Sequence, residues 1–129
     1  MATELTHIWL LVEDMTRARA FYRDTLGIEL LNDLGEYVEF KPNSNFYLAL
    51  FTRSAFELGE PAIPVAPAGG QRAVLALQVD ALDAYYVRLC EQGVDIVSTQ
   101  NRHPEWGLRT VFLRDPDGNL ICLYVDVSA

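Results

Sequence analysis

The segment LLVEDMTRARAFYRDTLGIEL, residues 10–30, carries the signals of a strand, a helix and a second strand in that order. Apolar side chains between Asp14 and Gly27 recur at helical spacing, which predicts that this stretch is an α-helix. Asp14 is placed to accept hydrogen bonds from the free amides of the first helical turn. Gly27 is placed to end the helix, because glycine adopts the left-handed conformation of a C-cap without a Cβ clash.

The same order of signals returns in LQVDALDAYYVRLCEQGVDIV, residues 77–97. Here Asp80 takes the place of Asp14 as the expected N-cap, and Gly93 takes the place of Gly27 as the expected C-cap. The aspartate and the glycine are equally far apart in the two copies. A repeat of this length indicates that a half-domain has been duplicated.

Strand-like segments follow each of the two helices. They are residues 28–33, 36–41 and 46–52 in the first half, and residues 94–98, 108–114 and 119–126 in the second. The sequence DPDG at 115–118 predicts a hairpin turn, because proline presets φ and glycine accepts a positive φ. Each half therefore predicts a βαβββ module.

The stretch GEPAIPVAPAGG, residues 59–70, is rich in proline and glycine, which is typical of a linker. We expect an α+β protein in which residues 1–129 form a single domain. Module one covers about 1–56, the linker about 57–72 and module two about 73–129, with boundaries uncertain by a few residues.

Composition and charge exclude several classes of protein. Half of the residues are hydrophobic and 22% are charged, which is typical of a globular chain. The net charge of −8 argues against nucleic acid or an anionic membrane as a partner, because both attract basic surfaces. Two cysteines, Cys90 and Cys122, do not predict a disulfide framework, and the N-terminus shows no signal peptide. We therefore expect a cytoplasmic protein.

The βαβββ repeat, together with FYRDTLG (21–27) and WGLRTVFLRDPDGNL (106–120), resembles the vicinal-oxygen-chelate superfamily. That superfamily includes glyoxalase I, extradiol dioxygenases, fosfomycin-resistance enzymes and bleomycin-resistance proteins. The resemblance implies curved mixed sheets around a cleft, with helices on the outer face and often a homodimer. It does not decide the function, because the fold hosts metal enzymes and metal-free binding proteins alike.

The resemblance also implies where metal ligands would lie in this chain. The four positions carry His7, Ala49, Val74 and Cys122. Alanine and valine have no donor atoms, and one imidazole with one thiolate falls short of the three or four protein ligands that zinc commonly takes. We therefore predict no metal site and no cofactor, with Cys122 as a small buried apolar residue. A remnant site completed by a further side chain, for example Glu39, is the alternative.

Side chains alternate along a strand, so the residues that accompany the former ligand positions should line the same cleft. The predicted ligand-binding residues are His7, Trp9, Tyr47, Phe51, Gln78, Trp106, Cys122 and Tyr124. Trp106 is included because family members often extend a flap at this place. For the aromatic residues, the alternative is a place in the core, and this alternative is favoured for Phe51. For His7, the alternative is a hydrogen-bonded histidine in the wall of the cleft.

An aromatic, largely apolar wall with a few polar tips is the usual composition of a site for organic molecules. We expect a metal-free protein that sequesters an aromatic or cationic small molecule, with no nucleic acid or membrane partner, as a homodimer. The alternative is a lyase, isomerase or dioxygenase of the same superfamily that uses a metal or His7 as general base. The sequence leaves open whether the protein is an enzyme.

Overall fold

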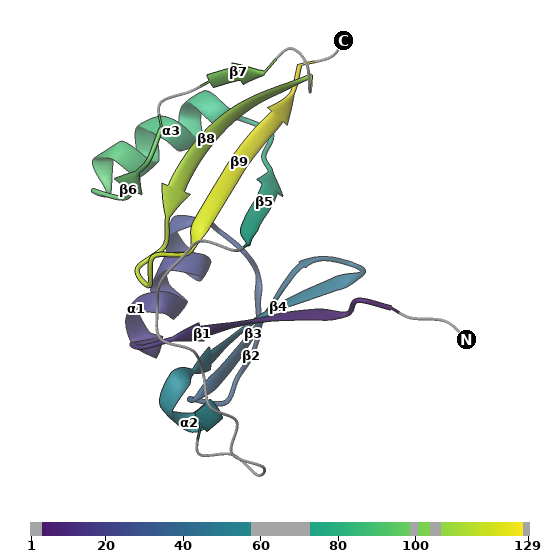
Figure 1. Ribbon diagram of the computed structural model, residues 1–129, viewed down its shortest axis with the longest axis vertical. Coiled ribbons are helices and arrows are strands. Elements are labelled where there is room, and N and C mark those ends of the chain that lie inside the picture. The colour runs from purple at the N-terminus through teal and green to yellow at the C-terminus, as the bar shows by residue number, and fades with distance from the viewer. Residues whose placement is uncertain (1–3, 58–72, 99–100, 104–106, 128–129) are drawn as a thin grey trace. The chain divides into compact units, whose positions relative to one another are not determined.

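A computed structural model describes residues 4–57, 73–98, 101–103 and 107–127, with backbone pairing alone for 101–103 (Figure 1). The chain divides into two compact units, residues 1–68 and 69–129. The division falls inside the predicted linker, most of which lies outside the described residues. A single domain built from both modules stays a prediction, as does a cleft between them.

The first unit has the predicted order of strand, helix and three strands. Its elements are β1 (His7–Val12), α1 (Met15–Ala20), the π-helical turn η1 (Phe21–Thr25), β2 (Leu30–Asp33), β3 (Tyr37–Asn43), β4 (Phe46–Thr52) and α2 (Arg53–Glu57). The strands form one sheet in the order β1-β4-β3-β2, with β1 parallel to β4 and the other pairs antiparallel. The short helix α2 was not anticipated by the sequence.

The second unit repeats this topology. Its elements are β5 (Val74–Gln78), α3 (Leu82–Glu91), β6 (Asp95–Ile96), β7 (Asn101–His103), β8 (Leu108–Arg114) and β9 (Leu120–Asp126). The sheet order is β5-β9-β8-β6, with β7 also paired to β8 and with β5 parallel to β9. The predicted α+β fold of tandem βαβββ modules is therefore confirmed.

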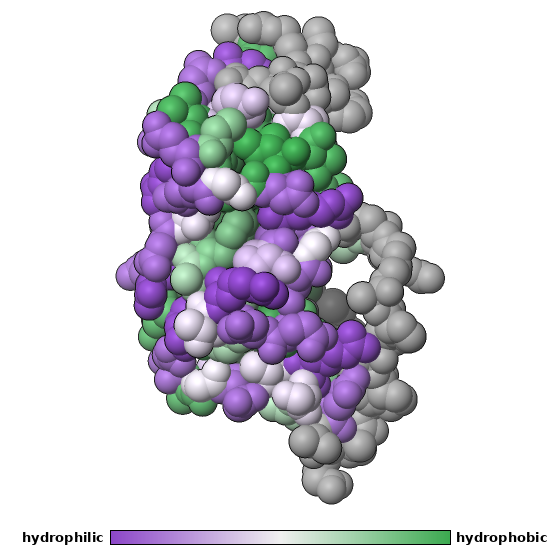
Figure 2. All heavy atoms as spheres, turned by 90° about the vertical axis from the view of Figure 1, so that its left-hand side faces the viewer, coloured by the Kyte–Doolittle hydropathy of each residue, from purple (hydrophilic) through white to green (hydrophobic). Residues whose placement is uncertain are grey.

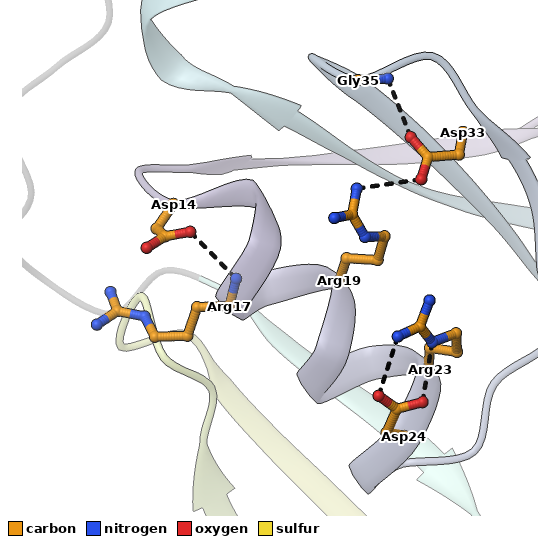
Figure 3. A network of polar contacts seen from close by, with 7 residues as sticks. All are labelled: Asp14, Arg17, Arg19, Arg23, Asp24, Asp33 and Gly35. Carbon is orange, nitrogen blue, oxygen red and sulfur yellow. Dashed lines mark hydrogen bonds and ion pairs between the residues drawn. The ribbon is translucent and has the colours of Figure 1, made fainter.

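The helix caps agree with the sequence at three of the four predicted positions. The Asp14 side chain accepts a hydrogen bond from the Arg17 amide at 3.1 Å (Figure 3), and Gly27 and Gly93 adopt φ of 71° and 68°. The prediction for Asp80 was wrong. Helix α3 starts one residue later than expected, so Ala81 occupies the N-cap position and no side chain caps it.

Helix α1 is tied to its sheet by Asp33, as Figure 3 shows. One carboxylate oxygen of Asp33 pairs with Nη1 of Arg19 at 3.0 Å, and the other accepts a hydrogen bond from the Gly35 amide at 3.0 Å. Gly35 lies in the turn between β2 and β3 with a φ of 85°, a conformation that favours glycine. The edge strand β2 is thus connected both to the helix and to its own turn.

The core of each unit lies between its sheet and its main helix. In the first unit the fully buried side chains include Val12, Ala18, Tyr22, Val38, Phe40 and Leu50; in the second they include Leu89, Val111, Leu113 and Ile121. Alternation along β1 and β4 directs His7, Trp9 and Tyr47 to the opposite face of the first sheet. That face is free of the main helix and carries the candidate site.

Hydrophilic side chains make up most of the face shown in Figure 2, in keeping with the net charge of −8. Among the residues that the structure describes, no helix is both long and apolar enough to cross a membrane.

The caps give a matched pair of variants. Asp14→Ala should lower the free energy of unfolding by about 1 kcal/mol, because the first-turn amide of Arg17 loses its acceptor. Asp80→Ala should change it by less than about 0.5 kcal/mol, because that exposed carboxylate caps no helix. Urea denaturation followed by circular dichroism measures both, and equal losses in the two variants would contradict the assignment of the caps.

Candidate functional site

The candidate site is built on three adjacent strands of the first sheet. Trp9 on β1 lies opposite Ala49 on β4, and Ala49 in turn lies opposite Glu39 on β3. Because Ala49 carries only a methyl group, the long side chains of β1 and β3 have room to meet above it. Ala49, one of the four ligand positions that the resemblance implies, therefore leaves space between β1 and β3. The carboxylate of the site comes from Glu39 on the neighbouring strand β3.

Glu39 is the polar centre of this arrangement. Its Oε2 lies 3.1 Å from Nε2 of His7 and accepts a hydrogen bond from the Tyr37 hydroxyl at 2.8 Å. Its Oε1 accepts a longer hydrogen bond, 3.5 Å, from the Asn32 side-chain amide. The Glu39 side chain is only 13% exposed. A carboxylate so withdrawn from water needs such donors, because burying an unpaired charge is costly.

Both ring nitrogens of His7 are engaged. Nδ1 lies 2.8 Å from the Thr6 hydroxyl, while Nε2 faces Glu39. Since a carboxylate only accepts, Nε2 carries a proton and donates to Glu39; this assignment follows from the partner. In this arrangement neither nitrogen presents a free lone pair to a metal ion.

The hydroxyl of Tyr37 is held in its protonated, donating form. Burial raises the pKa of Tyr37, and the hydrogen bond to Glu39 and the negative charge of Glu39 raise it further, to about 12. A hydrogen bond with Trp9 acts in the opposite direction but is the weakest of these effects. Tyr37 therefore remains a hydrogen-bond donor to Glu39 throughout the neutral range.

An aromatic cluster holds the ring of Trp9 in place. Its neighbours are Tyr37, Phe51 and Phe56, with ring centroids 6.3, 5.8 and 6.4 Å away in edge-on or tilted contacts. Trp9 itself remains 52% exposed. Such edge-to-face pairs fix the orientation of a ring, so the cluster presents part of the indole to solvent in a defined position.

Beside the cluster, His7 stacks on Tyr47, with ring centroids 4.7 Å apart and planes 15° from parallel. Nζ of Lys41 lies 3.1 Å from the Tyr47 hydroxyl and 4.5 Å from the centre of its ring. The ring of Tyr47 thus packs against the imidazole of His7, and the ammonium group of Lys41 contacts Tyr47.

These side chains border a shallow hollow of about 550 Å³ on the first unit. It is lined by Glu4, Leu5, Thr6, His7, Trp9 and Tyr37. Of the predicted site residues, the structure places His7 and Trp9 in the wall, with Tyr47 and Phe51 in ring contact with them. Tyr37 and Phe56 were missed. Alternation along β3 could have found Tyr37, whereas Phe56 comes from the unanticipated helix α2.

The remaining predicted site residues belong to the second unit. Gln78 pairs with Tyr124, and Cys122 lies one step along the same face of β9. Cys122 is buried, and burial raises the pKa of its thiol, which makes it a poor nucleophile or ligand. Trp106 lies outside the described residues. That these four residues share a cleft with His7 stays a prediction.

Comparison with known proteins identifies the family. Residues 4–123 match the Glyoxalase/Bleomycin resistance protein/Dioxygenase superfamily. The chain belongs to this superfamily. The resemblance seen in the sequence is thereby confirmed.

Curated members of the superfamily are similar over nearly the whole chain. The uncharacterized protein YraH of Bacillus subtilis (strain 168) is 31% identical over 125 residues, which cover 94% of this chain and 97% of YraH. The metallothiol transferase FosB of Shouchella clausii (strain KSM-K16) is 27% identical over 129 residues, with coverage of 100% and 84%. The structure of a lactoylglutathione lyase from Agrobacterium tumefaciens superposes with a TM-score of 0.73 at 27% identity, covering 96% of this chain and 94% of the lyase.

The side chains present do not fit the metal that the superfamily's enzymes imply. Two of the four ligand positions, Ala49 and Val74, have no donor atom, and the imidazole of His7 is engaged on both sides. Within the described part of the chain, no three His, Cys, Asp or Glu side chains form a group that could hold a metal ion. No step is therefore assigned to a metal.

The polar centre can be tested by titration. Glu39→Gln should lower the pKa of Tyr37 from about 12 toward its ordinary value of 10.0, because the negative charge disappears while burial remains. NMR of ¹³Cζ-labelled tyrosine measures the shift, with Tyr37→Phe to assign the signal. An unchanged titration would show that Glu39 does not govern this hydroxyl.

Proposed function

We propose that the protein binds an organic small molecule, with an aromatic ring of the ligand against Trp9, and that it does so without a metal. The observation that carries the proposal is the half-exposed Trp9, whose ring is held by three aromatic rings beside a hollow that Glu4, Thr6 and His7 also line. Concave, aromatic surfaces with few polar groups are the usual form of such sites. Binding would remove the exposed indole surface from water.

The magnitudes suggest how strongly simple probes should bind. Covering roughly 200 Å² of apolar surface contributes about 5 kcal/mol, and ring stacking adds about 0.5–1.5 kcal/mol. Association costs about 4 kcal/mol or more. The balance is at most about 2.5 kcal/mol, so a two-ring probe is expected to bind with a Kd of roughly tens of millimolar, and a larger natural ligand more tightly.

The polar groups favour binding over chemistry. His7 has partners at both nitrogens, Tyr37 holds its proton up to a pKa of about 12, and the thiol of Cys122 is buried with a raised pKa. General acid–base catalysis works best with groups that titrate near the operating pH. The site thus supports recognition by shape and rings.

The second candidate is a metal-free enzyme with His7 as general base, favoured by the contact between His7 and Glu39. A carboxylate partner orients an imidazole, and rotation of the Thr6 hydroxyl would free Nδ1 for a substrate proton. Glyoxalase and extradiol-cleavage assays of the wild type and of His7→Ala, without added metal and with added Ni, Zn, Mn or Fe, test this candidate. It fails if the wild type shows no turnover without added metal, or if His7→Ala turns over equally fast.

We further propose that the protein acts in the cytoplasm as a homodimer whose partner is a small molecule. The family resemblance supports the homodimer, and the absence of a disulfide framework supports the compartment. Sedimentation equilibrium of the purified chain measures the assembly directly.

Ligand binding is expected to depend on Trp9. Thermal-shift and NMR titration with planar two-ring compounds should detect binding to the wild type, and Trp9→Ala should weaken it by about tenfold or more, because the stacking surface is removed. Val87→Ala, which shortens an exposed apolar side chain on α3, serves as the control and should bind like the wild type. Equal binding by all three proteins would exclude the Trp9 hollow as the site.

The metal-free character has its own test. Protein purified without chelator and then dialysed should contain far less than one equivalent of Ni, Zn, Mn or Fe by elemental analysis, since too few donors are present. Tight metal in a one-to-one ratio would overturn this part of the proposal.

A further inference from the structure

We infer that the hollow beside Trp9 selects ligands whose aromatic ring carries a positive charge, such as an N-alkylated heterocycle, with Glu39 as the main counter-charge. The inference rests on the proposed function and deepens it, because it names the class of ligand. It is carried by the charge of the site, the chemistry of its hydrogen bonds and the indole beside it.

Among the residues that the structure describes, no lysine or arginine pairs with Glu39. Its partners are the Tyr37 hydroxyl, the Asn32 amide and the His7 imidazole. The hydroxyl and the amide donate hydrogen bonds without a full positive charge. The carboxylate is therefore stabilised in the folded protein and still exerts its field on the hollow, whose wall contains its neighbours His7 and Tyr37.

The wall of the hollow adds to this field. Glu4 lines it directly, and among the residues that the structure describes, none that lines the hollow is a lysine or an arginine. Lys41, on the same strand as Glu39, points its Nζ at Tyr47 and does not line the hollow. A charge on an exposed residue such as Glu4 is screened by salt, whereas the 13% exposed side chain of Glu39 is screened less. Glu39 should thus contribute more to selectivity than Glu4.

Trp9 provides the second attraction for a cation. The face of an indole carries a negative potential, and tryptophan is the strongest of the aromatic residues in cation–π contacts. Because Tyr37, Phe51 and Phe56 hold its ring, Trp9 loses little further side-chain freedom when a ligand binds. A flat cation in contact with Trp9 would interact with the indole ring and with the nearby carboxylate of Glu39 at the same time.

A pair of matched probes separates charge from shape. We suggest 1-methylquinolinium as the cation and 1-methyl-2-quinolone as a neutral ring system of nearly the same size, titrated against the full chain. The signal is the indole N–H resonance of Trp9, assigned by its loss in Trp9→Phe. The cation should bind about tenfold more tightly than the neutral probe, which corresponds to about 1.4 kcal/mol.

The variants locate the source of the preference. Glu39→Gln keeps an oxygen acceptor for Tyr37 and removes the charge, so it should abolish most of the tenfold difference between the two probes. Glu91→Gln removes the same charge from an exposed residue at the end of α3 and should retain the full difference. Glu4→Gln should show an intermediate or small effect because of screening.

Each outcome decides between the hypotheses. If both probes bind the wild type equally, or if Glu39→Gln retains the preference, the cation inference is wrong and the proposed binding function stands. If neither probe perturbs Trp9 at concentrations up to roughly tens of millimolar, the proposed function itself fails. The comparison of the two probes in the wild type needs no variant, so the inference remains falsifiable even if Glu39→Gln does not fold.

Discussion

The site depends on a carboxylate that is largely withdrawn from water and is held above a methyl group. Glu39 reaches over Ala49 toward His7 and Tyr37, and this meeting of β1 and β3 across β4 is feasible because the intervening residue is small. A larger side chain at Ala49 would occupy the space in which the hydrogen bonds form. The hydrogen bonds in turn orient His7, add to the effect of burial in raising the pKa of Tyr37 and place Tyr37 at the edge of the aromatic cluster.

The same residues explain how a fold with metal-binding members can host a different kind of site. The first unit has the fold of the superfamily, but Ala49, one of the ligand positions that the resemblance implies, has no donor atom. His7 keeps its place and acquires protein partners at both nitrogens instead. A scaffold of this type fixes directions for side chains, and the chemistry follows from the residues that occupy those directions.

The sequence was sufficient for the fold because its signals are local. Asp14, Gly27 and Gly93 act within one helical turn of their positions, and alternation gives the faces of β1 and β4 directly. The prediction for Asp80 was wrong because α3 starts one residue later than expected. Only the side chain at the N-cap position itself is placed to accept from the first-turn amides.

The site was less predictable, because its contacts run diagonally between strands and from a short helix. Tyr37 on β3 contacts Trp9 on β1 across the intervening strand β4, and Phe56 reaches the cluster from α2. Alternation along β3 indicates the face on which Tyr37 lies but not its contact with Trp9, and it says nothing of Phe56. His7 and Trp9 were found because the family resemblance and alternation on β1 pointed to the same face.

The π-helical turn η1 has a consequence for how the two halves of the chain could diverge. Its wider turn is closed by hydrogen bonds from the amide of Leu26 to the carbonyl of Phe21 and from that of Ile28 to Tyr22. A π turn holds one more residue than the α-helical turn it replaces. The first helical segment therefore contains one residue more than the second, whose N-cap, Ala81, lies one residue after Asp80. The distance along the chain from Asp14 to Gly27 thus equals that from Asp80 to Gly93, without an insertion or deletion. Evolution could in this way shift one helix start and retain the alignment of the strands that follow.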